Sequence, residues 1–241
     1  MAAELGCEHV CLFTQAISPS LPSVGDADVP ALAAAMADAG VSAYGVTSFV
    51  VGGPIPLADL ERGLARGQQL GAQYASVRIE EPDEARAAEG FAGLAELAAR
   101  HGLVASIEFV GYGNPELLPR TLRIIEAAGA GALSIDPTHI VRSGASLDLL
   151  RRVSPARIGY VQLCDGPAEA PESAYMNEMR YERLPPGEGA FPLAEILSVV
   201  PAGRAVSLEV PQASLADASA IDRCRRAVEA TRRFLAATEP D

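Results

Sequence analysis

The segment from Ser134 to Gly144 places an acid, an imidazole and a guanidinium three residues apart. Asp136 ends a short apolar run, His139 and Arg142 follow at equal spacing, and Gly144 marks a turn. A carboxylate can bind a metal or take a proton, an imidazole transfers protons near neutral pH, and a guanidinium binds carboxylate or phosphate. These three side chains therefore form the first candidate site.

Three further strand-like runs also end in a side chain that can bind a metal. They end at Glu108, Gln162 and Glu209. Together with Asp136 they supply oxygen donors from four separate strands, a set that suits Mn²⁺, Mg²⁺ or Co²⁺ rather than a thiolate-bound metal. Because the carboxyl ends of barrel strands gather on one face, we expect one shared site.

Strand-like and helix-like runs alternate along the chain. Strands are expected at His9–Thr14, Val41–Ser48, Tyr74–Ile79, Leu103–Phe109, Ala132–Asp136, Ile158–Leu163 and Ala205–Val210. Helices are expected at Asp28–Ala39, Leu57–Leu70, 83–100, 114–128, Leu147–Val153, Leu193–Val199 and Ala216–Ala237, with a long polar loop before Leu193. Strict alternation with buried, β-rich strands predicts a parallel sheet wrapped by helices.

The pattern predicts an α/β fold, a (β/α)8 TIM-barrel-like domain with seven strands visible. A closed barrel takes eight strands, and residues 2–6 resemble the last turn of a helix that ends at Gly6. We therefore expect that the first strand and most of its helix are missing from this sequence. No linker or low-complexity tract interrupts the chain, so residues 1–241 are expected to form a single domain.

Charge and hydropathy disfavour several classes of function. The formal net charge of -12 opposes binding to a phosphate backbone, which depends on clustered Lys and Arg. Asp38 interrupts the most apolar early region, and no apolar run is long enough to span a bilayer. The first residues lack the pattern of a secretory signal, and the four cysteines are too scattered for a disulfide framework. We expect a cytoplasmic protein that binds neither nucleic acid nor membrane.

The order of the strand ends is similar to that of a known family. The chain resembles the xylose isomerase-like barrels, the sugar phosphate isomerase/epimerase group. The resemblance lies in the order of five features: a strand ending in Glu, a strand followed by Asp-x-x-His, a strand ending in Gln or His and followed by Asp, a Gly-x-Gly loop, and a strand ending in Glu. The resemblance runs from Leu5 to the last helix. It implies a TIM barrel that holds one divalent metal ion.

In that family the metal ligands are the strand-end Glu, Asp, His and Glu. The matching positions in this sequence are Glu108, Asp136, Gln162 and Glu209. Gln162 stands where many members have histidine, and the segments 161–165 and 180–189 look most like the subgroup that includes 3-dehydroshikimate dehydratases, in which glutamine can be a ligand. An amide oxygen is a harder donor than imidazole, so zinc is disfavoured relative to Mn²⁺, Mg²⁺ or Co²⁺.

The resemblance also implies a chemistry. Members typically bind a hydroxy-carbonyl compound on the metal and move a proton on the adjacent carbon, while the metal stabilises the enediolate and a carboxylate takes the proton. Glu108 and Glu209 are the candidate catalytic carboxylates, one for each side of a substrate carbon, which suits epimerisation or isomerisation. If the enolate instead expels a neighbouring hydroxyl, the same site is a dehydratase with His139 as acid or base.

Substrate-binding roles are predicted for His139, Arg183 and Arg142. The imidazole would face the substrate, and either guanidinium could clamp a carboxylate or phosphate. Asp165 is interpreted as a residue that orients a metal ligand. The Gly187-Glu188-Gly189 run is interpreted as a loop turn.

Two classes of function stay open. The first is an enzyme that acts on a small polyhydroxylated carbonyl substrate, either an isomerase/epimerase or a dehydratase. The second is a non-catalytic barrel that serves as a binding or partner subunit, because an incomplete barrel exposes two sheet edges that a partner or a homo-oligomer would cover. The four strand-end donors favour the enzyme, since a non-enzyme has no need of them.

Overall fold

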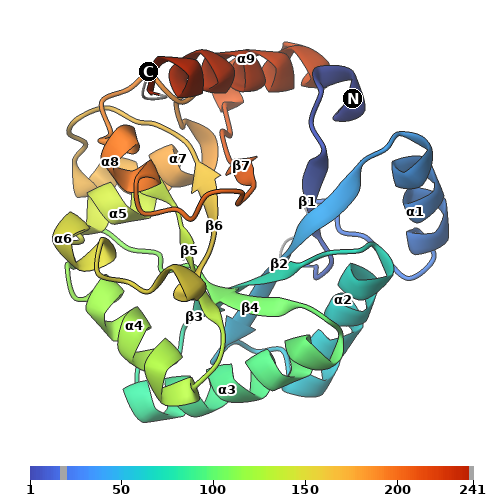
Figure 1. Ribbon diagram of the computed structural model, residues 1–241, viewed down its shortest axis with the longest axis vertical. Coiled ribbons are helices and arrows are strands. Elements are labelled where there is room, and N and C mark those ends of the chain that lie inside the picture. The colour runs from blue at the N-terminus through green and yellow to red at the C-terminus, as the bar shows by residue number, and fades with distance from the viewer. Residues whose placement is uncertain (17–20, 239–241) are drawn as a thin grey trace. The chain divides into compact units, whose positions relative to one another are not determined.

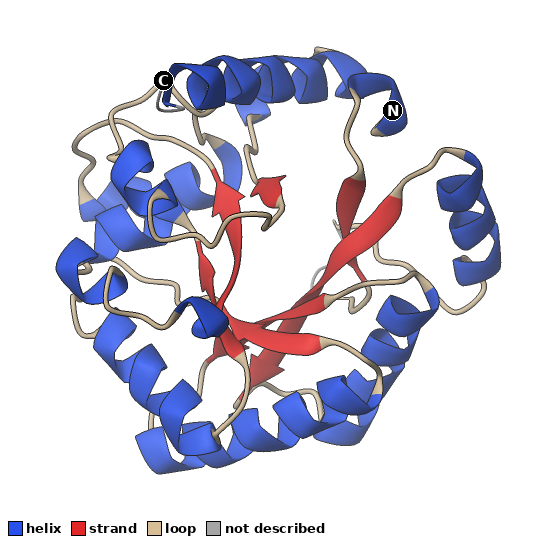
Figure 2. Cartoon of the chain, in the orientation of Figure 1, coloured by secondary structure: helices blue, strands red, loops and turns tan. Residues whose placement is uncertain are grey.

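A computed structural model gives the structure of residues 1–16 and 21–238 (Figures 1 and 2). The chain divides into two compact units. The N-terminal unit comprises residues 2–109 and 120–134, and the C-terminal unit comprises Met1, residues 110–119 and the chain from residue 135 onward. Strands and helices alternate in both units, as the sequence predicts.

The N-terminal unit contains most of the sheet. Its strands are β1 (His9–Phe13), β2 (Ser42–Val51), β3 (Tyr74–Ile79), β4 (Val104–Ile107) and most of β5 (Ala132–Ile135). Its helices are α1 (Val29–Asp38), α2 (Leu57–Gln69), α3 (Glu84–Arg100) and most of α4 (Leu117–Ala128). Helix α2 packs on β2 and helix α3 on β4, so these helices cover the outer side of the strands (Figure 1).

The C-terminal unit contributes fewer strands to the sheet than the N-terminal unit. Its strands are β6 (Ile158–Leu163) and β7 (Val206–Leu208). Its α-helices are α5 (Pro137–Ser143), α6 (Leu147–Leu150), α7 (Glu172–Tyr181), α8 (Leu193–Leu197) and α9 (Ala220–Thr238). Short 3-10 helices stand at Pro155–Arg157 and Ala213–Leu215 in this unit, and another at Ala3–Leu5 in the N-terminal unit ends at Gly6 as expected.

The strands pair in parallel. In the N-terminal unit β1 pairs with β2, β2 with β3, β3 with β4 and β4 with β5, and in the C-terminal unit β6 pairs with β7. The strand order in the sheet is the chain order. The predicted α/β class and the seven parallel strands are therefore confirmed for the part of the chain that the structure describes.

Strands β2, β5 and β6 carry fully buried side chains. Phe49 and Leu133 in the N-terminal unit and Ile135, Val161 and Leu163 in the C-terminal unit are all less than 1% exposed. Each such side chain stabilises the fold by about 1.5 to 3 kcal/mol through burial. A side chain that follows one of these strands is therefore carried on a rigid part of the molecule.

Helix α5 is a correction to the sequence prediction, in which the chain passed from the strand into a turn. Asp136 is the N-cap, and its Oδ1 accepts a hydrogen bond from the backbone N–H of Thr138 at 2.8 Å. Pro137 occupies the first helical position, where its fixed φ is favourable. Gly144 ends the helix at φ 75°, a left-handed conformation that glycine adopts without strain.

This short helix changes the meaning of the Asp-x-x-His-x-x-Arg spacing. Residues three apart lie on the same side of a helix. The helix therefore presents the carboxylate of Asp136, the imidazole of His139 and the guanidinium of Arg142 in a row along one face.

Helix α7 is a second correction, because it lies inside the predicted polar loop. Its buried side chains are Tyr175 and Glu178, so it lacks the aliphatic repeat that marks most helices. Pro171 before the helix and Glu172 in its first turn are the start signals that the sequence offers.

The segment that contains α7 begins and ends at two residues that are paired with each other. The backbone groups of Asp165 and Leu184 exchange two hydrogen bonds of 2.8 and 2.9 Å. Residues 166–183 therefore form an excursion whose two ends are joined.

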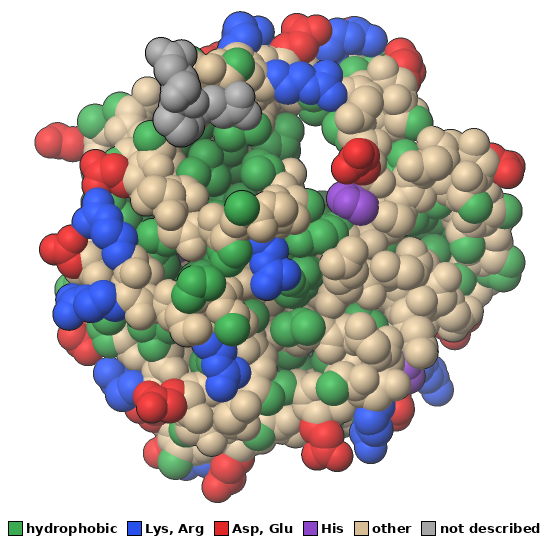
Figure 3. Space-filling model, in the orientation of Figure 1, with side chains coloured by type: hydrophobic (Ala, Val, Ile, Leu, Met, Phe, Trp, Pro, Cys, Tyr) green, Lys and Arg blue, Asp and Glu red, His purple; other side chains and the backbone are tan. Residues whose placement is uncertain are grey.

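The surface of helix α9 mixes both signs of charge. Figure 3 shows basic and acidic side chains next to one another over this helix, and Arg225 bonds to Asp222 at 2.8 Å while Arg226 bonds to Glu188 at 2.7 Å. Among residues 1–16 and 21–238, no helix is both long and apolar enough to cross a membrane.

Candidate functional site

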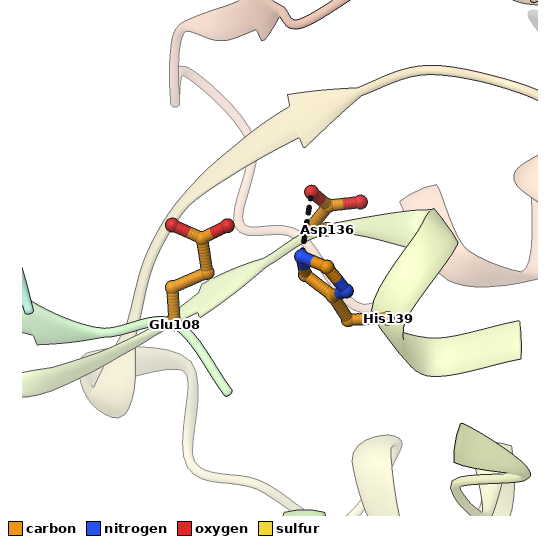
Figure 4. A group of neighbouring side chains, drawn as sticks. All are labelled: Glu108, Asp136 and His139. Atoms are coloured by element: carbon orange, nitrogen blue, oxygen red, sulfur yellow. Dashed lines mark ion pairs between the residues drawn. The ribbon is translucent and has the colours of Figure 1, made fainter. Parts of the chain in front are cut away.

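Asp136, at the carboxyl end of β5, is 2% exposed and is held through both carboxylate oxygens. Oδ2 accepts a hydrogen bond from Nη1 of Arg183 at 2.8 Å, and Nε2 of His139 lies 3.5 Å from the same oxygen (Figure 4). Oδ1 accepts from the backbone of Thr138 and, at 3.5 Å, from Sγ of Cys164. The orientation of this carboxylate is therefore set by the surrounding chain.

The charges at this position support an ionised carboxylate. Burial raises the pKa of Asp136, but the charges of Arg183 and His139 and the hydrogen bonds from Arg183 and Thr138 bring it below its ordinary value. Burial alone would lower the pKa of Arg183, yet Asp136 and Glu209 raise it well above its ordinary value. Carboxylate and guanidinium are both charged at neutral pH.

Gln162 lies within β6 and Glu209 directly follows β7. The Nε2 of Gln162 donates to Oε2 of Glu209 at 2.6 Å, and Nη1 of Arg183 lies 3.6 Å from that oxygen. The Oε1 of Gln162 is buried and has no hydrogen-bond partner among the described residues. A buried acceptor without a donor costs about 1 to 3 kcal/mol. A cation is a partner that would satisfy this oxygen.

His139 is 2% exposed and contacts a residue that the sequence did not indicate. Its Nδ1 lies 2.9 Å from the hydroxyl oxygen of Tyr175 on α7. The rings of the two residues meet edge to face, and the ring of Tyr112 packs on Tyr175 with 5.6 Å between centroids. The imidazole is therefore confined by an aromatic wall as well as by Asp136.

Arg142 is also buried, but its partners differ from those of Arg183. Its Nε and Nη2 donate to the two carboxylate oxygens of Glu178 at 2.7 and 2.6 Å. Nη2 also donates to the carbonyl of Pro167, and the guanidinium stacks on the ring of Phe191 at 4.9 Å. This fork geometry joins α5 to α7.

Asp165 orders the loop that contains the Gly-x-Gly run. Its Oδ1 accepts from the backbone N–H groups of Gly166 and Phe191, and its Oδ2 from those of Gly187 and Gly189, all at 2.8 to 3.0 Å. A side chain at position 189 would collide with the Asp165 carboxylate and the Gly166 carbonyl. The contacts of Asp165 are thus with the loop backbone, whereas the sequence suggested that it orients a metal ligand.

Glu108 belongs to the N-terminal unit, where it directly follows β4. Its backbone N–H donates to the carbonyl of Val77 at 2.9 Å, which continues the ladder with β3 by one residue. The hydroxyl of Ser76 on β3 donates to its Oε2 at 3.1 Å. The predicted placement of Glu108 at a strand end is therefore confirmed, and Ser76 orients it.

The C-terminal unit brings five of the predicted side chains into one connected set. These are Asp136, His139, Gln162, Arg183 and Glu209. Arg142 lies in the same unit, but it contacts Glu178, Phe191 and backbone carbonyls instead. Sequence reasoning missed Tyr175 and Glu178 because both lie in α7, which was predicted as loop.

The donor set fits a divalent cation. In the C-terminal unit, Asp136 and His139 each offer a ligand atom of a kind that binds metal ions, and Gln162 adds a buried oxygen without a partner among the described residues. Carboxylate and amide oxygens are the ligands of Mg²⁺ and Mn²⁺, and an imidazole widens the choice toward other transition metals.

Solved structures with the same fold cover nearly all of the chain. The IolI protein, whose structure carries a bound zinc atom, is 16% identical with a TM-score of 0.83, over 100% of this chain and 92% of that one. D-psicose 3-epimerase is 18% identical with a TM-score of 0.67, over 95% and 89%. AsbF of Bacillus anthracis, a probable 3-dehydroshikimate dehydratase of petrobactin synthesis, is 16% identical with a TM-score of 0.68, over 96% and 90%. At these identities the likeness shows the fold alone.

A family comparison carries the assignment further. The curated proteins contain no match to this sequence. The family model described as xylose isomerase-like TIM barrel matches residues 1–235, almost the entire chain. The chain therefore belongs to the xylose isomerase-like TIM barrel family.

Proposed function

We propose that this chain is a divalent-metal-dependent enzyme that moves a proton beside the carbonyl of a small polyhydroxylated substrate, as an isomerase or epimerase does. The proposal treats residues 1–241 as one barrel domain. The observation that carries it is the buried Oε1 of Gln162, which has no hydrogen-bond partner among the described residues and belongs to the side chain that bonds to the carboxylate of Glu209. Nothing in ordinary packing requires an unpaired amide oxygen next to a carboxylate, and a metal ion would satisfy both.

The proposed ligands are the side chains predicted from the sequence, Glu108, Asp136, Gln162 and Glu209. When bound, the metal would supply Lewis acidity that polarises the substrate carbonyl. Mn²⁺, Mg²⁺ or Co²⁺ is proposed ahead of zinc because three carboxylates and an amide are hard donors.

The chain itself would provide the proton acceptors. Glu209 is 42% exposed at its side chain, so it can reach a substrate while Asp136 stays buried. Glu108 is proposed as the second carboxylate, and His139 as the group that contacts a substrate hydroxyl. Two acceptors on different strands would suit removal of a proton from one face and its return to the other.

The two arginines receive different roles. Arg183 contacts Asp136 and approaches Glu209, so we propose that it offsets the carboxylate charges and binds an anionic or hydroxyl group of the substrate. Arg142 is engaged by Glu178 through two of its three guanidinium nitrogens, Nε and Nη2. We therefore propose a structural role for Arg142 in place of the substrate-binding role that the sequence suggested.

A dehydratase is the second candidate, and Gln162 favours it. Glutamine at this position matches the subgroup whose members include 3-dehydroshikimate dehydratases. In such a reaction His139 would donate a proton to the departing hydroxyl. We further propose that the protein acts in the cytoplasm on a small molecule rather than a nucleic acid, as a homo-oligomer or beside a partner subunit.

Metal content tests the proposal directly. Chelator-treated protein is dialysed against Mn²⁺, Co²⁺ or Mg²⁺ and analysed for bound metal beside Glu209→Gln and Asp136→Asn. We expect about one ion per wild-type chain, with clear loss in both variants. Equal metal content in all three proteins would exclude the proposed site and favour the non-catalytic barrel.

The reaction class is tested with metal-loaded protein in deuterated water. Ketoses and 3-dehydroshikimate serve as probes. Deuterium uptake without loss of water supports epimerisation, whereas a new conjugated absorbance supports dehydration. Neither signal with either probe, in a protein that binds the metal, would count against both candidate reactions on these substrates.

A further inference from the structure

Helices α5 and α7 are joined by two contacts in matching register. His139 and Arg142 are three residues apart on α5, and their partners Tyr175 and Glu178 are three residues apart on α7. Residues with this spacing face the same side of a helix. The two contacts therefore form successive rungs between one face of α5 and one face of α7.

All four side chains of these rungs are removed from solvent. His139 is 2% exposed, and Tyr175, Glu178 and Arg142 are each 6% exposed. A buried fork between arginine and carboxylate is strongly directional, because both charges lose their hydration and depend on each other. The second rung thus determines how α7 lies on α5, and with it the place of the Tyr175 hydroxyl.

We propose that Tyr175 is a positioning residue that holds the imidazole of His139 with Nε2 toward Asp136, and that the Arg142–Glu178 pair holds Tyr175 in place. The catalytic role of His139 rests on the proposed function. The positioning contact is a property of the fold and does not depend on it.

The hydrogen-bond roles follow from the neighbours of the ring. Nε2 faces a carboxylate oxygen of Asp136 at 3.5 Å, and because carboxylate oxygens accept hydrogen bonds, we assign the ring hydrogen to Nε2. In the neutral ring Nδ1 is then an acceptor, and the hydroxyl of Tyr175 donates to it across 2.9 Å. Tyrosine therefore selects one of the two tautomers, as second contacts to a functional imidazole commonly do.

The chain provides a matched pair of tyrosines for the test. Tyr112 packs on Tyr175, but its hydroxyl donates to the carbonyl of Ala170 at 2.6 Å. Tyr175→Phe and Tyr112→Phe each remove one hydroxyl from the same aromatic wall. Only the first removes a hydrogen bond to His139.

The measurement is the ¹⁵N resonance of the ring nitrogens in metal-free protein labelled at histidine. The sequence has three histidines, and His139→Asn identifies the relevant signals. We expect wild type to show hydrogen on Nε2, and Tyr175→Phe to shift the Nδ1 signal toward the value of a nitrogen without a hydrogen bond. Tyr112→Phe should leave both signals in place. Wild-type hydrogen on Nδ1, or equal shifts in the two variants, would overturn the assignment.

The second rung is tested with Glu178→Gln against Glu172→Gln, an exposed glutamate on the same helix. We expect Glu178→Gln to raise hydrogen exchange of α7 amides at least tenfold and also to shift the His139 signals. Tyr175→Phe should shift those signals with α7 exchange unchanged. If Glu178→Gln loosens α7 while His139 keeps its wild-type signals, the pair does not hold Tyr175.

These measurements need neither metal nor substrate, so they separate this inference from the proposed function. A protein that binds no metal can still show the tautomer, and one that binds metal can still lack it. If both proposals hold, Tyr175→Phe should lower kcat several-fold with little change in KM, because the ring would be misdirected while the substrate still binds.

Discussion

The C-terminal unit buries two arginines against carboxylates, and the two clusters differ in one respect. Each guanidinium nitrogen of Arg142 has an acceptor: Nε and Nη2 donate to the carboxylate of Glu178, Nη2 also donates to the carbonyl of Pro167, and Nη1 donates to the carbonyl of Ala168. Around Arg183 the carboxylates outnumber the cation, and Gln162 contributes a buried oxygen with no partner among the described residues. The first cluster is complete, whereas the second has acceptors in excess.

This difference separates a structural ion pair from a binding site. A complete buried pair stabilises one arrangement of two helices and offers nothing to a ligand. An excess of oxygen acceptors is unfavourable in the isolated chain and becomes favourable when a cation arrives. Burial and the presence of an arginine are common to both clusters, so these two features alone do not identify which cluster is the candidate binding site.

The largest expected effect is on the complete pair. Glu178→Gln should lower the free energy of unfolding by about 3 to 5 kcal/mol, because Arg142 is left buried without its countercharge. Urea denaturation followed by circular dichroism measures this loss.

An exposed pair of the same shape supplies the control for that variant. Arg123 forks onto Glu84 with bonds of 2.8 and 2.9 Å, but their side chains are 51% and 42% exposed. Glu84→Gln should therefore cause only a small fraction of the loss. Similar losses in the two variants would mean that burial does not distinguish these pairs.

Replacement of Arg183 should lower the free energy of unfolding, and added metal should restore part of that loss. Arg183→Gln takes a charged donor from Asp136, and we expect a loss of about 2 to 3 kcal/mol in metal-free protein. Added Mn²⁺ should raise the melting temperature of this variant more than that of wild type, because the cation supplies the missing charge. It should do no more for Glu178→Gln than for wild type. Equal metal-induced shifts in the three proteins would contradict the comparison.

The buried Oε1 of Gln162 should affect metal affinity more than stability. Gln162→Leu removes Oε1, and we expect Mn²⁺ affinity to fall about tenfold or more, which corresponds to about 1.4 kcal/mol. The free energy of unfolding of metal-free protein should change by less than about 1.5 kcal/mol, since one hydrogen bond to Glu209 is lost and one buried acceptor without a partner among the described residues disappears. Calorimetric titration gives the affinity, and Gln69→Leu on the exposed side of α2 is the control.

The smallest effect concerns pH at the exposed fork. The hydrogen bond from Arg123 lowers the pKa of Glu84 below its ordinary value of 4.5. A lowered pKa means that the pair adds stability above the ordinary value and that this contribution is lost as the pH falls through the lowered one. In Arg123→Gln the carboxyl signal of Glu84 should titrate at higher pH by NMR. An unchanged titration would show that the fork is not populated in solution.

The strands were predictable from the sequence because burial on both faces leaves a plain signal. The observed β3 and β6 coincide with the predicted Tyr74–Ile79 and Ile158–Leu163. Strand ends in turn located the oxygen donors, since functional side chains of parallel α/β barrels gather at the carboxyl ends of the strands. This is why the sequence pattern alone was sufficient to identify Asp136, Gln162 and Glu209 as candidate ligands.

The contacts between these residues were not predictable in the same way. Arg183 and Tyr175 lie on the excursion between Asp165 and Leu184, whose path depends on tertiary contacts. Its helix buries a tyrosine and a glutamate, so hydropathy gave no periodic signal. The Asp-Pro start and glycine end of α5 were readable signals, but the short length of the helix and the preceding strand concealed them.

The closed base of the excursion has a consequence for how this fold can vary. Because Asp165 and Leu184 pair directly, the chain between them can be lengthened or shortened without pulling β6 out of register. Doubling such a loop costs only about 0.6 kcal/mol in closure entropy. A different insert grafted between the same two residues would exchange Tyr175, Glu178 and Arg183, so it would have to supply new partners for Arg142 and Asp136.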